Sequence, residues 1–260
     1  MSSTITPGSL YRDTVNFFCH QRINIIIMAI ITSFITMSLS HILYSYTDDE
    51  KLQIILGVGG TTTGGASNNI LSIIDIIQKM SFDQWILLLR ISAIRIFIIL
   101  MGHTLMLGGM LNLITMVSSG ENANSNILLL ALEKAISQFP RLLILLLLTT
   151  IISQLGFIVL IAPGIILTIL LALSPIIMIR EKKSILAAIR ASTEISCRYN
   201  QLVTPAVLLW FLGKCLILLL ATTFLIALPM IIATAILNVI HYIINAVLTI
   251  YLYRLYMLVK

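Results

Sequence analysis

The amino-acid sequence predicts an all-α fold, a bundle of about six transmembrane helices with short amphipathic helices at the membrane surface. Of its 260 residues, 59% are hydrophobic and only 10% are charged. A soluble protein usually has about 25% charged residues, so this chain cannot cover its surface with polar groups. Apolar runs of roughly 18 or more residues recur along it, each long enough to cross about 30 Å of hydrocarbon as an α-helix. A single integral membrane domain is therefore predicted over residues 1–260.

The apolar runs give the predicted spans in chain order. The first run is longer than the apolar core of a signal peptide, and no small-residue cleavage site follows it. The predicted spans are Ile23–Tyr44, Ile96–Met116, Leu142–Leu160, Pro163–Ile179, Leu202–Ile226 and Met230–Met257. Spans three and four meet at Ala162-Pro163-Gly164, and spans five and six meet near Pro229, without a charge at either junction. Two tight hairpins are predicted, and a re-entrant pair at Pro163-Gly164 is the alternative to a full crossing.

The distribution of Lys and Arg predicts the orientation, because basic loops are retained on the cytoplasmic side. With the amino terminus inside, the outer side holds only Lys51, Lys79, Arg90 and Arg95. The inner segments hold Arg12, Arg22, Lys134, Arg141, Arg180, Lys182, Lys183, Arg190, Arg198, Arg254 and Lys260. Both termini are therefore expected in the cytoplasm, with the protein crossing its membrane several times.

The segment between spans one and two, residues 45–95, is the predicted outer, periplasmic loop. It begins with a Gly/Thr/Asn-rich linker, which has too few bulky residues to form a core. In its second half Ser72, Asp75, Gln78 and Lys79 recur at helical spacing among Ile and Leu, which predicts an amphipathic helix on the membrane surface. Ser81 and Gln84 then fit a capping box before the helix that becomes span two.

Residues 180–201 predict a basic helix on the cytoplasmic surface. Ile185, Ala188, Ile189, Ser192, Ile195 and Tyr199 share one face, and Lys183, Arg190, Glu194 and Arg198 share the other. An apolar face beneath a basic stripe is typical of a helix in the headgroup plane of an anionic leaflet. The stripe, together with Lys182 and Lys183, either anchors the membrane surface or recognises a lipid headgroup or an acidic partner. A weaker surface helix is predicted over Ile127–Phe139, ended by Pro140.

Lys214 is the charged residue that the spans do not explain. It lies about a dozen residues from either end of span five, and an ammonium group there costs on the order of 3 kcal/mol. No Asp or Glu falls inside a predicted span to pair with it. Lys214 is therefore either satisfied by hydroxyl and carbonyl groups or contacts an anion or a lipid phosphate. His103 and His241 are each expected to stand alone as hydrogen-bonding side chains.

Motifs for enzyme chemistry and for cofactors are missing from the sequence. It has no Walker loop, no GxSxG elbow and no HExxH, so neither catalytic residues nor a cofactor are predicted. The three cysteines, Cys19, Cys197 and Cys215, have no CxxC spacing, and no disulfide framework or metal cluster is expected. The net charge of +6 follows from the cytoplasmic bias of the basic residues and does not require nucleic acid as a partner.

Four segments carry a resemblance to a known family. YRDTVNFF from Tyr11, PGIILTILLALSP from Pro163, PAVLLWFLGK ending at Lys214 and IYLYRLYMLVK at the end resemble the YciC-like family of enterobacterial inner-membrane proteins. The resemblance implies a multi-span protein of the bacterial inner membrane, and it implies a location more than a mechanism. A looser pattern around Glu181 and Ala188-x-Arg190-x-Ser192 is similar to the membrane domain of some glycerophosphodiester phosphodiesterases, whose catalytic domain is missing here.

Two functions remain open from the sequence. The first is a non-enzymatic protein that supports envelope or membrane organisation through lipid or membrane-protein contacts of its inner surface helices. The second is a small transporter or permease for an anionic solute or lipid, with Lys214 at the centre of the bilayer and prolines such as Pro163 and Pro175 breaking helices. A membrane-embedded enzyme ranks last, because no nucleophile and base occur together.

Overall fold

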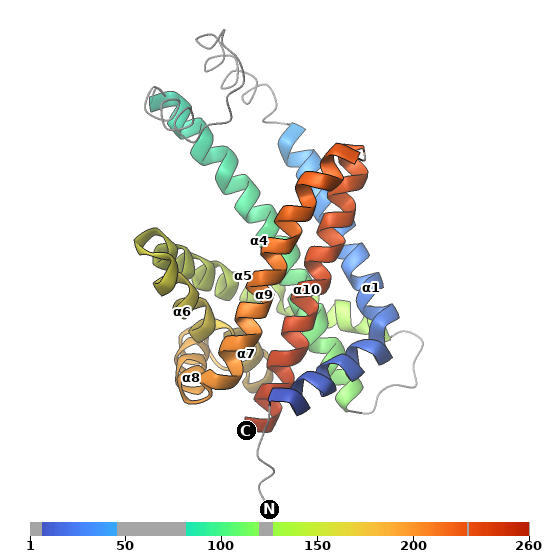
Figure 1. The fold of residues 1–260 in the computed structure, drawn as a ribbon, viewed down its shortest axis with the longest axis vertical. Helices are drawn as coiled ribbons and strands as arrows, with labels where there is room; N and C mark the ends of the chain where they lie inside the picture. The colour runs from blue at the N-terminus through green and yellow to red at the C-terminus, as the bar shows by residue number, and fades with distance from the viewer. Residues whose placement is uncertain (1–6, 46–81, 120–126, 228, 260) are drawn as a thin grey trace, which may run out of the picture. The chain divides into compact units, whose positions relative to one another are not determined.

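The computed structural model describes residues 7–45, 82–119, 127–227 and 229–259. All regular structure within these residues is α-helical, which confirms the predicted fold class. Figure 1 shows how the helices follow one another from the amino to the carboxyl end. They are α1 (Pro7–Ser45), α4 (Phe82–Ser118), α5 (Ile127–Val159), α6 (Ile161–Leu171), α7 (Ser174–Glu181), α8 (Ile185–Arg198), α9 (Asn200–Ala227) and α10 (Met230–Val259).

The described residues contain six helical segments long and apolar enough to cross a membrane, which confirms the predicted number. They are Gly8–Leu43, Phe82–Ser118, Ile127–Val159, Ile161–Glu181, Asn200–Ala221 and Ile231–Val259. Several begin well before the predicted spans, because polar residues flanking an apolar run still continue its helix. The amphipathic helix predicted around Ser72–Lys79, and Ser81 of the predicted capping box, lie outside the described residues.

The chain divides into two compact units. The first contains Met1–Phe34 and Leu100–Lys260, and the second contains Ile35–Ile99. In the second unit the structure describes the end of α1 and the first half of α4, so the loop predicted over 45–95 is only partly described. Its outer position, and a single domain over residues 1–260, stay predictions. All predicted site residues belong to the first unit.

An N-terminal arm, Pro7–His20, precedes the first apolar run. It is the first part of α1, and a kink at Gln21, with φ −107° and ψ 16°, separates it from the rest of the helix. Leu10, Thr14 and Phe17 are buried at helical spacing along one face of the arm. Asp13 Oδ2 lies 3.4 Å from Nε of Arg254, near the end of α10. The arm and the last turns of α10 therefore lie at the same end of this unit, as an even number of crossings requires.

Pro140 does not end a helix, contrary to the prediction from sequence. It lies inside α5, which continues from Ile127 to Val159. Proline removes one backbone hydrogen bond from a helix interior, and neighbouring packing can offset that loss. Apolar side chains on both sides of Pro140 are buried, including Ala131 and Ala135 before it and Leu142 and Leu145 after it. The proposed surface helix and span three are therefore one continuous helix.

The hairpin between α5 and α6 turns at Leu160, and not at Ala162-Pro163-Gly164 as predicted. Leu160 has extended backbone, with φ −164° and ψ 155°, and α6 starts at the next residue. Pro163 falls in the first turn of α6, where its missing N–H would have no partner within the helix anyway. Ile158 and Ile161, beside the turn, are 79% and 69% exposed. The tip thus presents apolar side chains, which suits a position inside the bilayer.

The fourth predicted span is broken into two helices. Ala172 and Leu173 form a turn between α6 and α7, and Pro175 occupies the first turn of α7. Without an N–H, Pro175 cannot continue the α6 hydrogen-bond pattern, which explains the break. Residues Ser174–Met178 are fully buried, so α7 is enclosed by protein up to its charged end.

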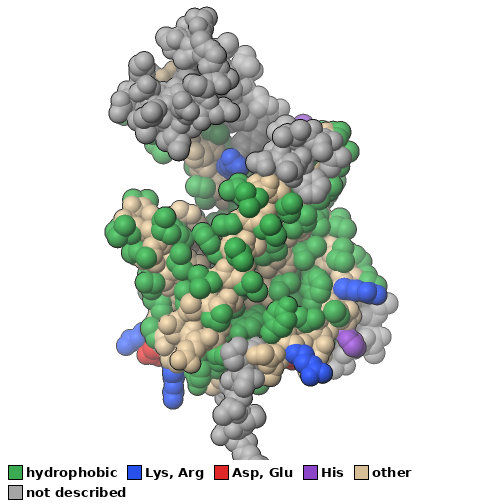
Figure 2. Space-filling model, in the orientation of Figure 1, with side chains coloured by type: hydrophobic (Ala, Val, Ile, Leu, Met, Phe, Trp, Pro, Cys, Tyr) green, Lys and Arg blue, Asp and Glu red, His purple; other side chains and the backbone are tan. Residues whose placement is uncertain are grey.

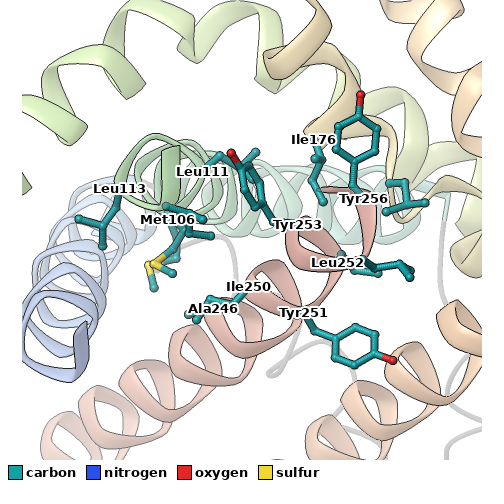
Figure 3. Close-up of a cluster of buried hydrophobic side chains, with 14 of the residues drawn as sticks. Met106, Leu111, Leu113, Ile176, Ala246, Ile250, Tyr251, Leu252, Tyr253 and Tyr256 are labelled. Carbon is teal, nitrogen blue, oxygen red and sulfur yellow. The ribbon is translucent and has the colours of Figure 1, made fainter. Parts of the chain in front are cut away.

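The core of the first unit draws buried side chains from each of the described helices, and one part of it joins α4, α7 and α10. Thr115 of α4 and Tyr253 of α10 have their hydroxyl oxygens 3.3 Å apart, which joins the two helices within the apolar packing. Figure 3 shows this part of the core, in which Leu113 and Tyr251 point to opposite sides: Met106, Leu111 and Leu113 of α4, Ile176 of α7, and Ala246, Ile250, Tyr251, Leu252, Tyr253 and Tyr256 of α10. The core therefore holds α7 and the carboxyl end of α10 together at the charged end of the unit.

Candidate functional site

A fixed corner joins α7 to α8. Lys182 ends α7 with a left-handed backbone, φ 51°, a conformation that costs a lysine about 1–2 kcal/mol. Arg141 of α5 offsets this cost, because its Nη2 donates to the carbonyl oxygens of Lys182 at 3.2 Å and of Lys183 at 2.6 Å. The corner is therefore tied to a separate helix, and the basic residues around it start from a defined backbone.

α8 packs on protein through the face that the sequence assigned to the membrane. Ala188, Ser192 and Ser196 are buried, and the hydroxyl of Ser192 donates to the Leu170 carbonyl oxygen at 2.7 Å. Ile185 and Ile195, on the predicted apolar face, pack against the core. Protein therefore covers part of this face, and the position of α8 in the headgroup plane stays a prediction. Apolar spacing identifies a buried face, but it does not say whether lipid or protein covers it.

Four of the five predicted site residues gather at this end of the unit. The side chains of Lys182, Lys183, Arg190 and Arg198 are all exposed there. Lys183 Nζ lies 2.6 Å from Glu181 Oε2, and the Arg198 guanidinium lies 5.9 Å from the centre of the Tyr199 ring. Figure 2 shows Lys and Arg side chains at the lower edge of the molecule, below a broad hydrophobic surface. Charged side chains thus lie at the border of a hydrophobic surface that is suited to contact lipid.

A small cavity opens beside the corner, between α7 and α10. Its volume is about 280 Å³, and its lining residues are Arg180, Glu181, Tyr256 and Met257. Tyr256 donates a hydrogen bond from its hydroxyl to Glu181, which links the two helices. Arg180 lies 5.5 Å from the centre of the Tyr253 ring, with Nη2 3.2 Å from Sδ of Met257. This cavity was not predicted from the sequence. Its α7 wall comes from the charged REKK run, and its α10 wall comes from the Tyr-rich carboxyl end.

Lys214 lies elsewhere, on α9 beside α10. Its Nζ is 2.7 Å from Nε2 and 3.1 Å from Nδ1 of His241, so it donates to whichever ring nitrogen is unprotonated. Nζ also lies 4.9 Å from the centre of the Trp210 ring. One turn away, Trp210 Nε1 donates to Oδ1 of Asn245 at 2.8 Å. Polar contacts thus join the two helices at successive turns.

The histidine contact corrects the sequence analysis on two points. The partner of Lys214 is an imidazole, and His241 does not stand alone. The expectation that His103 stands alone stays a prediction. One signal was present in the sequence: Lys214 and His241 lie at similar distances before and after Pro229, which puts them at similar depth in a helical hairpin. Lys214 is separate from the basic corner, which consists of Lys182, Lys183, Arg190 and Arg198.

The described residues offer no clear metal site. They contain no group of three or more His, Cys, Asp or Glu side chains that could hold a metal ion together. Cys19, Cys197 and Cys215 are free and exposed. The exposed Lys and Arg side chains of the corner offer positive charge and N–H donors.

The helices and their lipid-facing surfaces define a polytopic α-helical membrane protein. The model of the family described as "Uncharacterised protein family (UPF0259)" matches residues 1–258, and the chain belongs to that family. It is 38% identical over 256 residues to a UPF0259 membrane protein of Pectobacterium carotovorum, covering 98% of this chain and 99% of the relative. A UPF0259 membrane protein of Yersinia pestis is 37% identical over 256 residues, 98% of this chain and 96% of the relative. No solved structure matches the chain. The predicted membrane family from enterobacteria is thereby confirmed.

Proposed function

We propose that this chain is a non-enzymatic inner-membrane protein that supports membrane organisation by binding anionic lipids through its basic corner. The supporting observation is that Lys182, Lys183, Arg190 and Arg198 are all exposed around a backbone that Arg141 fixes. Each Lys or Arg near an anionic leaflet contributes about 1 kcal/mol of attraction. Four such residues on one rim favour a local enrichment of anionic lipid.

We expect the basic corner to bind lipids of the cytoplasmic leaflet, because of the orientation predicted for the chain. The N-terminal arm, the corner and the end of α10 lie at the same end of the unit, since Asp13 pairs with Arg254 and Tyr256 bonds to Glu181. Most Lys and Arg of the chain belong to segments at this end, and such segments stay in the cytoplasm. The exposed basic side chains then face the leaflet to which anionic lipids attract them.

A matched pair of double variants tests the proposal. Arg190→Gln with Arg198→Gln removes two charges from the corner, and Arg90→Gln with Arg95→Gln removes two from the predicted outer side. We expect the first double variant to bind phosphatidylglycerol about tenfold more weakly than wild type, and the second to bind it as wild type does. The measurement is the phosphatidylglycerol fraction retained by each protein in nanodiscs of phosphatidylethanolamine and phosphatidylglycerol, at two salt concentrations. Equal retention by both double variants would contradict the proposal.

A second candidate function rests on Lys214. Among the described residues its contacts are an imidazole and an aromatic ring, and none of them is a carboxylate. Lys214 and His241 place two nitrogen-bearing side chains side by side within predicted spans. Such a pair favours a passing anion, and the span broken at Pro175 is a feature shared with transporters. Anion uptake by reconstituted vesicles, with Lys214→Met as the comparison, tests this candidate.

A further inference from the structure

The cavity between α7 and α10 has the chemistry of a phosphate site, and this inference rests on the proposed function. Arg180 lines a space of about 280 Å³ together with Glu181, Tyr256 and Met257. Among the described residues, the contacts of its guanidinium group are the Tyr253 ring and the Met257 sulfur. Neither group carries a negative charge. A guanidinium group presents parallel N–H donors that match two oxygens of a phosphate, so an anion at this position would complete its hydrogen bonding.

The Glu181 carboxylate in the cavity wall does not prevent an anion from binding at Arg180. Glu181 accepts the hydroxyl hydrogen bond of Tyr256, and its other oxygen lies 2.6 Å from the Lys183 ammonium. Both contacts hold Glu181 in place, and the Lys183 ammonium balances its negative charge. Arg180 is then left as the net positive charge at the opening.

The surroundings place the cavity at the level of lipid headgroups. α7 is buried in the apolar core up to Met178, and the first charged residues follow directly at its end. Tyr253 and Tyr256 of α10 are buried beside this charged end, where they contact Arg180 and Glu181. Met257 is 45% exposed and offers apolar surface beside the opening. A molecule with a phosphate and an acyl chain can contact both Arg180 and this apolar edge.

We propose that the cavity binds one phospholipid, whose phosphate is held by Arg180. The Arg180 guanidinium is placed before the lipid arrives, because it lies over the Tyr253 ring and contacts the Met257 sulfur. Such preorganisation lowers the entropy lost on binding. The site differs from Arg190 and Arg198 because Arg180 lines a cavity with an apolar edge.

Native mass spectrometry of the full chain, titrated with phosphatidylglycerol, tests the site. Arg180→Gln removes the charge, and we expect it to weaken the tightest lipid about tenfold, the usual effect of losing a charge-assisted hydrogen bond. Met257→Phe keeps the charge but fills the cavity, and we expect a similar loss. Arg190→Gln is the matched control, with the tightest lipid retained as in wild type. Unchanged affinity in Arg180→Gln, or equal loss in Arg190→Gln, would overturn the proposal.

A soluble phosphate compound is the competing source of the same chemistry. Thermal unfolding of the delipidated protein with added inorganic phosphate separates the two sources. We expect phosphatidylglycerol, and not inorganic phosphate, to raise the melting temperature of wild type. The reverse result would make this a soluble-anion site and overturn the lipid assignment. If Arg180→Gln loses the tight lipid while the Arg190 and Arg198 double variant keeps its phosphatidylglycerol, the cavity stands and the proposed function of the basic corner fails.

Discussion

Replacing Gly156 by alanine is expected to destabilise the protein by about 1–3 kcal/mol, the usual cost of overpacking a close contact. Gly156 lies in α5 where α6 crosses closest. A Cβ atom there would be 2.7 Å from Cδ1 of Leu167 and 2.9 Å from Cα of Gly164. The leucine side chain can move, but the Gly164 backbone can move only by separating the two helices. The hairpin therefore opens, and the α6 contact with Ser192 is strained with it.

Gly8→Ala is the matched control for this substitution. It makes the same chemical change on the exposed N-terminal arm, where a Cβ atom would have nothing within 4 Å. The melting temperatures of both variants in one detergent provide the comparison. We expect a clear decrease for Gly156→Ala and none for Gly8→Ala. Equal melting temperatures would mean that α5 and α6 are not as close as described.

Replacing His241 by leucine is expected to cost on the order of 3 kcal/mol, the scale for an unpaired ammonium in the bilayer centre. Without His241, the contact left to Lys214 among the described residues is the face of the Trp210 ring. Removing both partners, with Lys214→Met and His241→Leu together, should restore most of the stability, because no buried polar group is then left unpaired. Unfolding of the two single variants and the double variant forms a complete cycle.

The outcome of this cycle also bears on the anion candidate. If the pair is structural, the double variant unfolds close to wild type, and vesicles containing it take up chloride no differently from vesicles containing wild type. Independent, additive losses would show that Lys214 and His241 do not pair. Chloride uptake that Lys214→Met abolishes, while its melting temperature is unchanged, would favour the anion candidate over the structural pairing.

Features that depend on composition were predictable from the sequence. The six spans follow from apolar runs, because a membrane fixes the length of helix that crosses it. The exposure of Arg190 and Arg198 follows from helical spacing on α8, because charged side chains rarely leave the surface of an amphipathic helix. Both properties are local, so one stretch of sequence contains all the information.

Features that depend on distant partners were not predictable. Arg141 caps two carbonyl oxygens about 40 residues further along the chain, and no local pattern marks that contact. The cavity at Arg180 needs α10 as its second wall. The buried face of α8 has the same apolar spacing whether α6 or lipid covers it. Pro140 has a strong local preference to end a helix, and packing on both sides overrides it.

The native cysteines give the most direct test of where the basic corner lies. Cys19 is on the N-terminal arm, Cys197 is near the end of α8, and Cys215 is in the apolar middle of α9, and all three are exposed. Variants that keep one cysteine each, with serine at the other two positions, report each place separately. A membrane-impermeant maleimide is applied to sealed spheroplasts and to inverted membrane vesicles. Cys215, surrounded by lipid, is the internal control and should react in neither preparation.

We expect Cys197 and Cys19 to react only in inverted vesicles, which expose the cytoplasmic surface. That result would place the corner and the arm beside the anionic inner leaflet. Reaction of Cys197 in intact spheroplasts would contradict it, because the basic residues would then face the other side of the membrane.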